Sequence, residues 1–184
     1  LIRTYASIVL RAGRQANSTI DALLLLAGVR RGSVTPRPLA MAEIVAEARE
    51  QVAPLLAERG GSIRLPDRWP AACGHAPWVV QIWTNYLSNG LKYSAQPPAL
   101  VLGATPQPNG MLQFWVQDHG PGLGPEARAR LFTEGTRLQP DQAPGNGLGL
   151  WIVRRIAERL GGSAGVESEP GRGCRFFFTL PPAV

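Results

Sequence analysis

Asn85-Tyr86-Leu87-Ser88-Asn89-Gly90-Leu91-Lys92-Tyr93 is the most informative stretch of this 184-residue chain. It ends a predicted helix, residues 77–92, with an apolar stripe of Val79, Val80, Trp83, Leu87 and Leu91. Helical spacing gathers four polar side chains on one face: Asn85, Asn89, Lys92 and Tyr93. Asparagine is disfavoured inside helices because its amide competes for backbone hydrogen bonds, so two on one stripe suggest a binding task. An amide oxygen can ligate Mg²⁺ and an ammonium can meet phosphate, although a solvated polar face is the alternative.

Two glycine-rich turns point in the same direction. Asp118-His119-Gly120-Pro121-Gly122-Leu123 follows a predicted strand, where a carboxylate can accept a hydrogen bond from an amino group such as that of adenine. Gly145-Asn146-Gly147-Leu148-Gly149-Leu150 runs into a predicted helix, whose unpaired amides and dipole favour an anion. This second turn lacks the Gly-Lys-Ser/Thr ending of a Walker loop. Taken singly, each turn is also compatible with an ordinary connection.

Composition excludes several other classes of protein. With 45% hydrophobic and 17% charged residues, the chain is expected to form a globular core. Its longest apolar run, residues 22–29, is too short to cross a bilayer. The formal charge is +6, but the arginines are scattered, so we expect no nucleic-acid partner. Cys73 and Cys174 lack metal-ligand spacing and suit a reducing compartment, which favours the cytoplasm. Lys92 is the only lysine, as if that position needed a compact ammonium.

The remaining pattern predicts an α+β domain preceded by a helical segment. Residues 2–27 lack proline and carry apolar side chains on several faces, which is typical of a helix packed against other helices. Glycines and prolines then interrupt the pattern, and we place the domain boundary between residues 35 and 36. Further helices are expected over 41–58, 125–132 and 148–160, and strands over 62–65, 98–105, 111–117, 163–168 and 174–180. The expected architecture is a two-layer α/β sandwich with a mixed, mainly antiparallel sheet.

In this order and spacing, the motifs closely resemble the histidine kinase branch of the Bergerat-fold ATPases. Residues 85–93 are similar to its N box and residues 118–122 to its G1 box. Leu131-Phe132 resembles the start of the F box, and residues 145–150 resemble the G2 box. The resemblance covers roughly residues 39–181, and it implies the Bergerat fold for residues 36–184. It also implies that residues 1–35 contain the second helix of a dimerisation and phosphoacceptor hairpin.

The same resemblance implies ATP and Mg²⁺ as ligands and transfer of the γ-phosphoryl group to a histidine. Asn89 would ligate the Mg²⁺ that bridges the phosphates, and Asn85 would support the environment of the metal or the catalytic water. Lys92 would contact phosphate. Tyr93 would pack on the adenine or ribose side. These transfers need mainly positioning and charge neutralisation.

The two turns receive their roles from the resemblance as well. Asp118 would read the adenine amino group, while Gly120 and Gly122 give room for the base. The G2 turn would bind the triphosphate and hinge a lid, residues 134–146, through Gly145, Gly147, Leu148 and Gly149.

The chain departs from the family pattern in identifiable places. Its only histidines are His75 and His119, and neither has the sequence context of the family's phosphoacceptor, so we expect the acceptor outside this stretch. The chain by itself is therefore not expected to autophosphorylate. Gly90 replaces a usual alanine, at a cost to the helix of about 1 kcal/mol. Gly135 stands where the F box usually has a second aromatic residue, which puts docking of the lid in doubt.

The expected partners follow from the same family. They are a response regulator receiver domain and a second copy of the parent protein, joined through the N-terminal helix. A membrane anchor in the parent is left open. Two alternatives are kept: a nucleotide-sensing or scaffolding module of the same fold that transfers no phosphate, and an anti-sigma-type serine kinase, which lacks the hairpin.

Overall fold

The computed structural model describes residues 35–133 and 147–183 of the chain. The elements in these ranges follow in the order β1 (Arg37–Pro38), α2 (Met41–Glu58), β2 (Ser62–Arg64), β3 (Cys73–Gly74), α3 (Ala76–Tyr93), β4 (Ala99–Pro106), β5 (Leu112–Gln117), α4 (Pro125–Arg130), α5 (Gly149–Arg159), β6 (Ala164–Ser168) and β7 (Cys174–Leu180). The helix predicted over residues 2–27 and the lid predicted over residues 134–146 lie outside the described residues.

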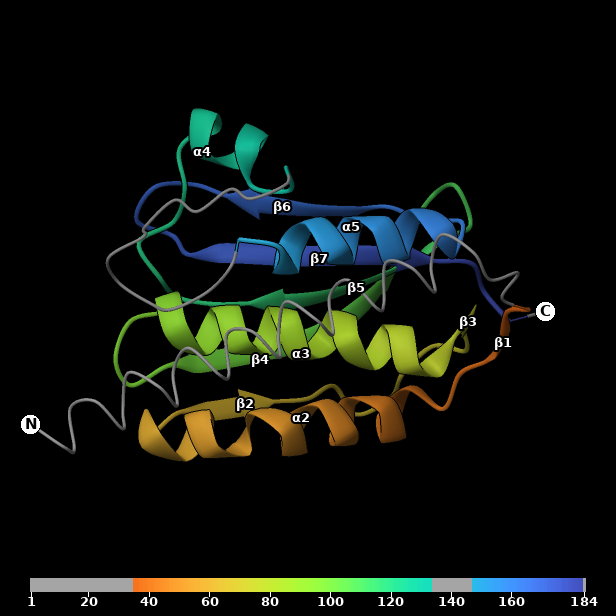
Figure 1. Ribbon diagram of the computed structural model, residues 1–184, viewed down its shortest axis with the longest axis horizontal. Coiled ribbons are helices and arrows are strands. Elements are labelled where there is room, and N and C mark those ends of the chain that lie inside the picture. The colour runs from red at the N-terminus through yellow and green to blue at the C-terminus, as the bar shows by residue number, and fades with distance from the viewer. Residues whose placement is uncertain (1–34, 134–146, 184) are drawn as a thin grey trace, which may run out of the picture.

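The main sheet has five strands in the order β2-β4-β5-β7-β6 (Figure 1). Only β2 and β4 run parallel; the other neighbouring pairs are antiparallel. Because β5 and β7 pair antiparallel with Gln117 opposite Arg175, the turn after β5 and the turn before β7 meet at the same end of the strands. This pairing confirms the mixed, mainly antiparallel sheet expected from the sequence.

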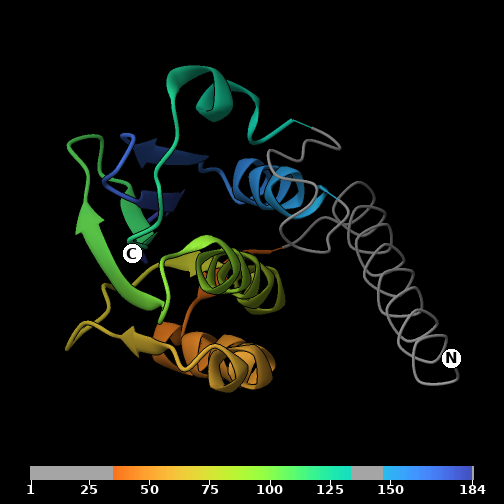
Figure 2. The same cartoon turned by 90° about the vertical axis from the view of Figure 1, so that its left-hand side faces the viewer.

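The helices α2, α3 and α5 lie on one face of this sheet, which makes the fold a two-layer sandwich (Figure 2). The buried residues of α2 recur at helical spacing, and they are Met41, Ile44, Val45, Ala48 and Val52. All five members of the stripe predicted for the second helix are buried in α3: Val79, Val80, Trp83, Leu87 and Leu91. The amphipathic period therefore selects which side of each helix meets the sheet.

Aromatic rings join α3 to the centre of the sheet. The Trp83 ring packs edge-on against Phe178 with centroids 5.3 Å apart, and Phe114 stacks on Phe178 at 5.4 Å. The buried Tyr86 hydroxyl donates a hydrogen bond of 2.7 Å to the carbonyl oxygen of Phe177 on β7. Trp83 Nε1 donates to the Met41 sulfur, 3.3 Å away. These contacts fix both the height and the rotation of α3 over the sheet.

A second, two-stranded sheet was not predicted. Arg37 pairs with Gly74 and Pro38 with Cys73 in antiparallel register, and Pro182 bridges to Ala72 beside them. Two-residue strands carry no alternating pattern, and proline ordinarily argues against a strand, so local sequence gives no signal here. The consequence is that the chain just after residue 36 is tied to the segment that leads into α3.

We predict that Tyr86→Phe lowers the free energy of unfolding by about 1 kcal/mol, because it removes a buried hydrogen bond without leaving a cavity. Denaturant unfolding of the 184-residue chain checks this. Thr84→Val on the same helix is the control, because the Thr84 hydroxyl bonds Gln51 in an exposed position and should contribute less than about 0.5 kcal/mol. Equal effects of the two variants would contradict the assignment of Tyr86 as a tie between α3 and β7.

Candidate functional site

The polar end of α3 lies against both glycine-rich turns. Gly120 approaches α3 so closely that a Cβ at this position would lie 2.8 Å from the Tyr93 carbonyl oxygen. Earlier in α3, a Cβ on Gly149 would collide with the Asn85 side-chain oxygen. The structure thus brings the N-box residues, the Asp118 turn and the start of α5 together around one helix, as the sequence predicts.

Asp118 lies at the end of β5 and is only 4% exposed. Its Oδ1 accepts two backbone hydrogen bonds, from Gly120 N at 2.8 Å and from Cys174 N at 3.1 Å. The other oxygen, Oδ2, accepts no hydrogen bond from the described part of the chain. A buried carboxylate with one oxygen fixed and the other free can receive a donor such as an exocyclic amino group.

Burial has an electrostatic consequence at this residue. Loss of hydration raises the pKa of Asp118 above its usual 3.8, and the hydrogen bonds from Gly120 and Cys174 and the nearby His119 offset part of that rise. Since the pKa in the folded chain exceeds the unfolded value, the ionised group costs stability at neutral pH. That cost begins to fall as the pH drops to the raised pKa and is gone below the pKa of the unfolded chain, so acidification relieves it.

The four polar residues of α3 have distinct surroundings. Asn85 Nδ2 donates 2.9 Å to the Gln81 carbonyl oxygen, which turns the amide oxygen toward Gly149. Asn89 is half-buried, and its side chain makes no hydrogen bond to the described residues, so its amide oxygen is available as a ligand. Tyr93 is 38% exposed at the end of the helix.

Lys92 is half-buried, and it forms no ion pair with any residue that the structure describes. Burial lowers its pKa, and the positive charge of Arg59 lowers it further. A cation held beside another cation without a carboxylate partner favours an anionic ligand at this place.

The start of α5 is arranged as an anion site. Gly147 has a φ of +68°, which glycine adopts readily, and α5 begins at Gly149 with no side chain capping its N-terminus. Leu148 is the N-cap residue, and its carbonyl oxygen accepts the first helical bond, from Ile152 N. No described residue accepts a hydrogen bond from the backbone amides of the first turn before Ile152, and amides of this kind at a helix start favour an anionic ligand. Gly145 lies outside the described residues.

Sequence reasoning missed two residues of this site. Ser168 and Cys174 are 9% and 7% exposed, respectively, and both contact the Asp118 turn or its hydrogen-bond partners. They lie at the end of β6 and the start of β7, about 50 residues after Asp118. The only local sign was the glycine turn between the two strands.

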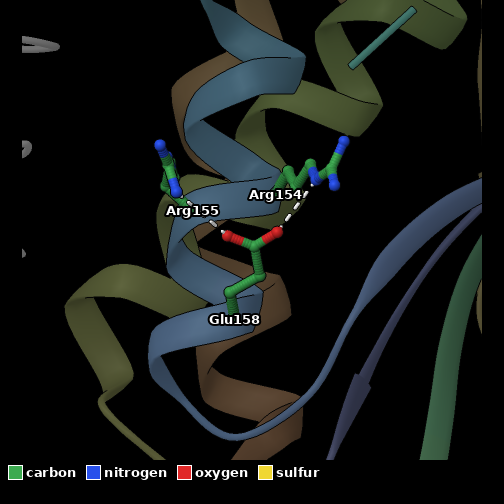
Figure 3. A network of polar contacts seen from close by, with 3 residues as sticks. All are labelled: Arg154, Arg155 and Glu158. Carbon is green, nitrogen blue, oxygen red and sulfur yellow. Dashed lines mark hydrogen bonds and ion pairs between the residues drawn. The ribbon is translucent and has the colours of Figure 1, made fainter. Parts of the chain in front are cut away.

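The outer face of α5 is polar and exposed (Figure 3). Glu158 forms ion pairs with Arg154 at 2.9 Å and with Arg155 at 3.4 Å, in helical i,i+4 and i,i+3 spacing. Solvated pairs of this kind contribute little to stability. They show that α5 buries only the side that meets the sheet and α3. None of the helices in the described ranges is long and apolar enough to cross a membrane.

Known proteins that are similar to this chain in sequence and fold include histidine kinases. Residues 74–184 match the family described as histidine kinase-, DNA gyrase B-, and HSP90-like ATPase. The chain is 36% identical over 159 residues to the methanogenesis regulatory histidine kinase FilI of Methanothrix harundinacea, covering 86% of this chain and 18% of that protein. It is 31% identical over 150 residues to the adaptive-response sensory kinase SasA of Prochlorococcus marinus, covering 79% and 39%. The chain thus spans well under half the length of these relatives.

Solved structures agree with the sequence relatives. Full-length ShkA in complex with AMPPNP superposes with a TM-score of 0.80 at 28% identity, covering 99% of this chain and 39% of that one. The mycobacterial sensor histidine kinase MprB superposes with a TM-score of 0.69 at 22% identity, covering 81% of this chain and 100% of that one. At that lower identity, the likeness to MprB speaks for the fold alone.

We predict that Asp118→Asn raises the stability of the chain at neutral pH while it weakens adenine-nucleotide binding by about tenfold or more. The new side chain keeps the Oδ1 hydrogen bonds and removes the buried charge, but its amide nitrogen cannot accept a hydrogen bond from a base amino group. Thermal unfolding and calorimetry with ADP measure the two effects. The stability gain should shrink as the pH falls through the raised pKa of Asp118; a gain independent of pH would refute the electrostatic cause.

A second prediction concerns the close contact between α3 and α5. Gly149→Ala should weaken nucleotide binding by about tenfold, because the new methyl displaces either the Asn85 amide or the first turn of α5. Gly124→Ala is the control, since a Cβ at Gly124 would meet no atom within 4 Å. Nucleotide titrations of both variants by calorimetry decide the matter, and unchanged affinity in Gly149→Ala would show that this approach is not part of the site.

Proposed function

This chain belongs to the family of histidine kinase-, DNA gyrase B- and HSP90-like ATPases, and on that premise we propose that it is the ATP-binding catalytic domain of a sensor histidine kinase. The observation that carries the proposal is the buried Asp118 carboxylate, which keeps one oxygen free beside the polar end of α3. An adenine amino group fits that acceptor, and an anion fits the start of α5.

ATP binds, in this proposal, with its base at Asp118 and its phosphates between Lys92 and the first turn of α5. Asp118 Oδ2 accepts a hydrogen bond from the base amino group. Gly120 and Gly122 lie in the turn beside the ring, and their missing side chains make room for the Tyr93 and Glu169 carbonyl groups. Lys92 meets the phosphates with a charge that no described carboxylate neutralises. Tyr93, exposed at the end of α3, packs on the adenine or ribose side. Gly145, Gly147, Leu148 and Gly149 surround the phosphates through their backbone.

Mg²⁺ fits the residues present, with Asn89 as its protein ligand. No cluster of three or more His, Cys, Asp or Glu side chains that could hold a metal occurs within the described ranges. A site built from one amide oxygen, phosphate oxygens and water suits Mg²⁺, which usually keeps several waters in nucleotide sites. When bound there, the ion neutralises negative charge on the phosphates. Asn85, held by Gln81, lies one helical turn before Asn89 and supports the same environment.

The reaction is transfer of the γ-phosphoryl group from ATP to a histidine nitrogen. The ADP oxygen leaves as the phosphorus–nitrogen bond forms, so the protein contributes positioning and charge stabilisation rather than a covalent intermediate. The acceptor histidine lies outside this chain in our proposal. Residues 1–35 supply the second helix of the hairpin that joins two copies of the parent, and residues 36–184 form the catalytic domain.

A response regulator receiver domain is the proposed recipient of the phosphoryl group, and the proposed location of this domain is the cytoplasm. The cysteines support that location, since neither Cys73 nor Cys174 forms a disulfide. We propose no nucleic-acid partner.

The parent protein carrying Asn89→Asp or Asp118→Ala should lose autophosphorylation by at least about a hundredfold. Asn89→Asp adds a negative charge beside the phosphates, and Asp118→Ala removes the acceptor for the base amino group. Incorporation of labelled phosphate from ATP measures this. Thr84→Val, on the same helix but away from the polar face, serves as the active control. Full activity in both site variants would overturn the residue assignments. Binding of ATP by the parent without any phosphohistidine would favour a nucleotide-sensing module instead.

A further inference from the structure

The turn that contains Asp118 and the turn between β6 and β7 are far apart in the sequence but are held together by several backbone contacts. The backbone of Asp118 donates 2.8 Å to the Cys174 carbonyl oxygen, and Gly171 N donates 2.7 Å to the Pro121 carbonyl oxygen. At Gly122, where φ is +71°, a Cβ would collide with the Glu169 carbonyl. The Asp118 turn and the turn between β6 and β7 therefore touch backbone to backbone along several residues.

Ser168 joins these two turns through one hydroxyl. Its Oγ accepts a hydrogen bond of 2.8 Å from Leu123 N, at the end of the Asp118 turn, and donates one of 2.7 Å to the Gly173 carbonyl oxygen. The side chain comes from the last residue of β6 and is 9% exposed. One buried oxygen thus holds the far end of one turn against the far end of the other.

The third neighbour of the hydroxyl completes its hydrogen bonding. Cys174 Sγ lies 3.3 Å from Ser168 Oγ. Because the serine proton is directed to Gly173, the thiol is the donor in this contact. Burial raises the pKa of Cys174 to about 11, so the thiol keeps its proton at neutral pH. Ser168 therefore uses its donor and both of its acceptor positions, all toward groups that surround Asp118.

The hydroxyl acts on Asp118 through its neighbours. Gly173 and Cys174 are consecutive, and Cys174 N is one of the two donors that hold Asp118 Oδ1. Leu123 ends the turn in which Gly120 supplies the other donor. If Ser168 Oγ is removed, the Leu123 N–H group and the Gly173 carbonyl oxygen each lose a hydrogen-bond partner. Each of these backbone groups must then find another partner or stay unpaired. The Asp118 carboxylate then stays charged but is no longer held in a fixed orientation.

We propose that Ser168 is a positioning residue for adenine recognition, which clamps the Asp118 turn to the β6–β7 turn so that Asp118 Oδ2 faces the base. This inference rests on the proposed function, since it concerns the same nucleotide site. It adds a selectivity element outside the recognised motifs, contributed by the last residue of β6.

Base selectivity is the informative readout, because it does not depend on how much of the chain is folded. Ser168→Ala should lower the ratio of inosine diphosphate to ADP dissociation constants by about tenfold, since inosine lacks the amino group that Asp118 reads. Binding of pyrophosphate, which has no base, should be unchanged. Calorimetry with these three ligands on the 184-residue chain measures the dissociation constants. Ser168→Thr keeps the hydroxyl and should have the same ratio as the unsubstituted chain.

Thr179→Val is the matched control. Thr179 is also 9% exposed. Its hydroxyl accepts a hydrogen bond of 2.8 Å from the N of Ser163, the residue before β6, and thus lies at the opposite end of the β6–β7 pair from Ser168. This variant should leave the selectivity ratio unchanged. An equal drop in both variants, or a Ser168→Ala ratio equal to that of the unsubstituted chain, overturns the proposal.

Amide hydrogen exchange in the absence of nucleotide separates this proposal from the function on which it rests. Exchange at Leu123 and Gly120 should accelerate at least about tenfold in Ser168→Ala and stay unchanged in Thr179→Val. If the unsubstituted chain binds none of the ligands, the proposed function fails, while the exchange rates still decide whether Ser168 clamps the turns. Unaltered exchange at Leu123 in Ser168→Ala contradicts the clamp whatever the ligands do.

Discussion

The Asp118 carboxylate is a negative charge almost entirely removed from water, and the geometry of the site follows from how that charge is accommodated. A buried carboxylate is costly unless it receives hydrogen bonds, and here two backbone amides supply them to the same oxygen. Those amides belong to Gly120, in the turn after β5, and to Cys174, at the start of β7. The carboxylate is therefore stable only when β5 and β7 are in register, and that register leaves its second oxygen free for a ligand.

The two faces of helix α3 have different roles: the apolar face stabilises the fold, and the polar face carries the candidate binding residues. Its apolar side packs Trp83 among the sheet aromatics and anchors Tyr86 to the β7 backbone. Since those contacts fix the rotation of the helix, they also fix the direction of Asn85 and Asn89 on the other side. The close approaches of Gly120 and Gly149 then bring the two turns to this polar face. The geometry of the candidate site is thus a consequence of core packing. This explains why the sequence of α3 contains both an apolar stripe and a set of polar residues on the other face.

Much of the fold could be predicted from the sequence because its elements are strongly periodic. The buried stripes of α2 and α3, the β4–β5 hairpin and the last two strands were all expected within a few residues of their observed bounds. The motifs placed the N box on a helix and Asp118 at a strand end, and both placements are confirmed. The roles of the individual site residues and the boundary between residues 35 and 36 remain predictions, as do the helix over residues 2–27 and the lid, which lie outside the described residues.

The remaining features had no local signature. The two-residue strands β1 and β3 exist only because two distant segments meet, and nothing in either segment alternates. Gly149 could be assigned to an anion-binding turn from its neighbours in sequence, but its contact with Asn85 depends on how α5 crosses α3. The same holds for Ser168, whose hydroxyl finds Leu123 across 45 residues of chain. Periodicity and motif spacing, which are local, determined the elements and the chemical groups that this protein offers. Distances between groups on different elements, which depend on sheet register and helix packing, were decided only by the tertiary structure.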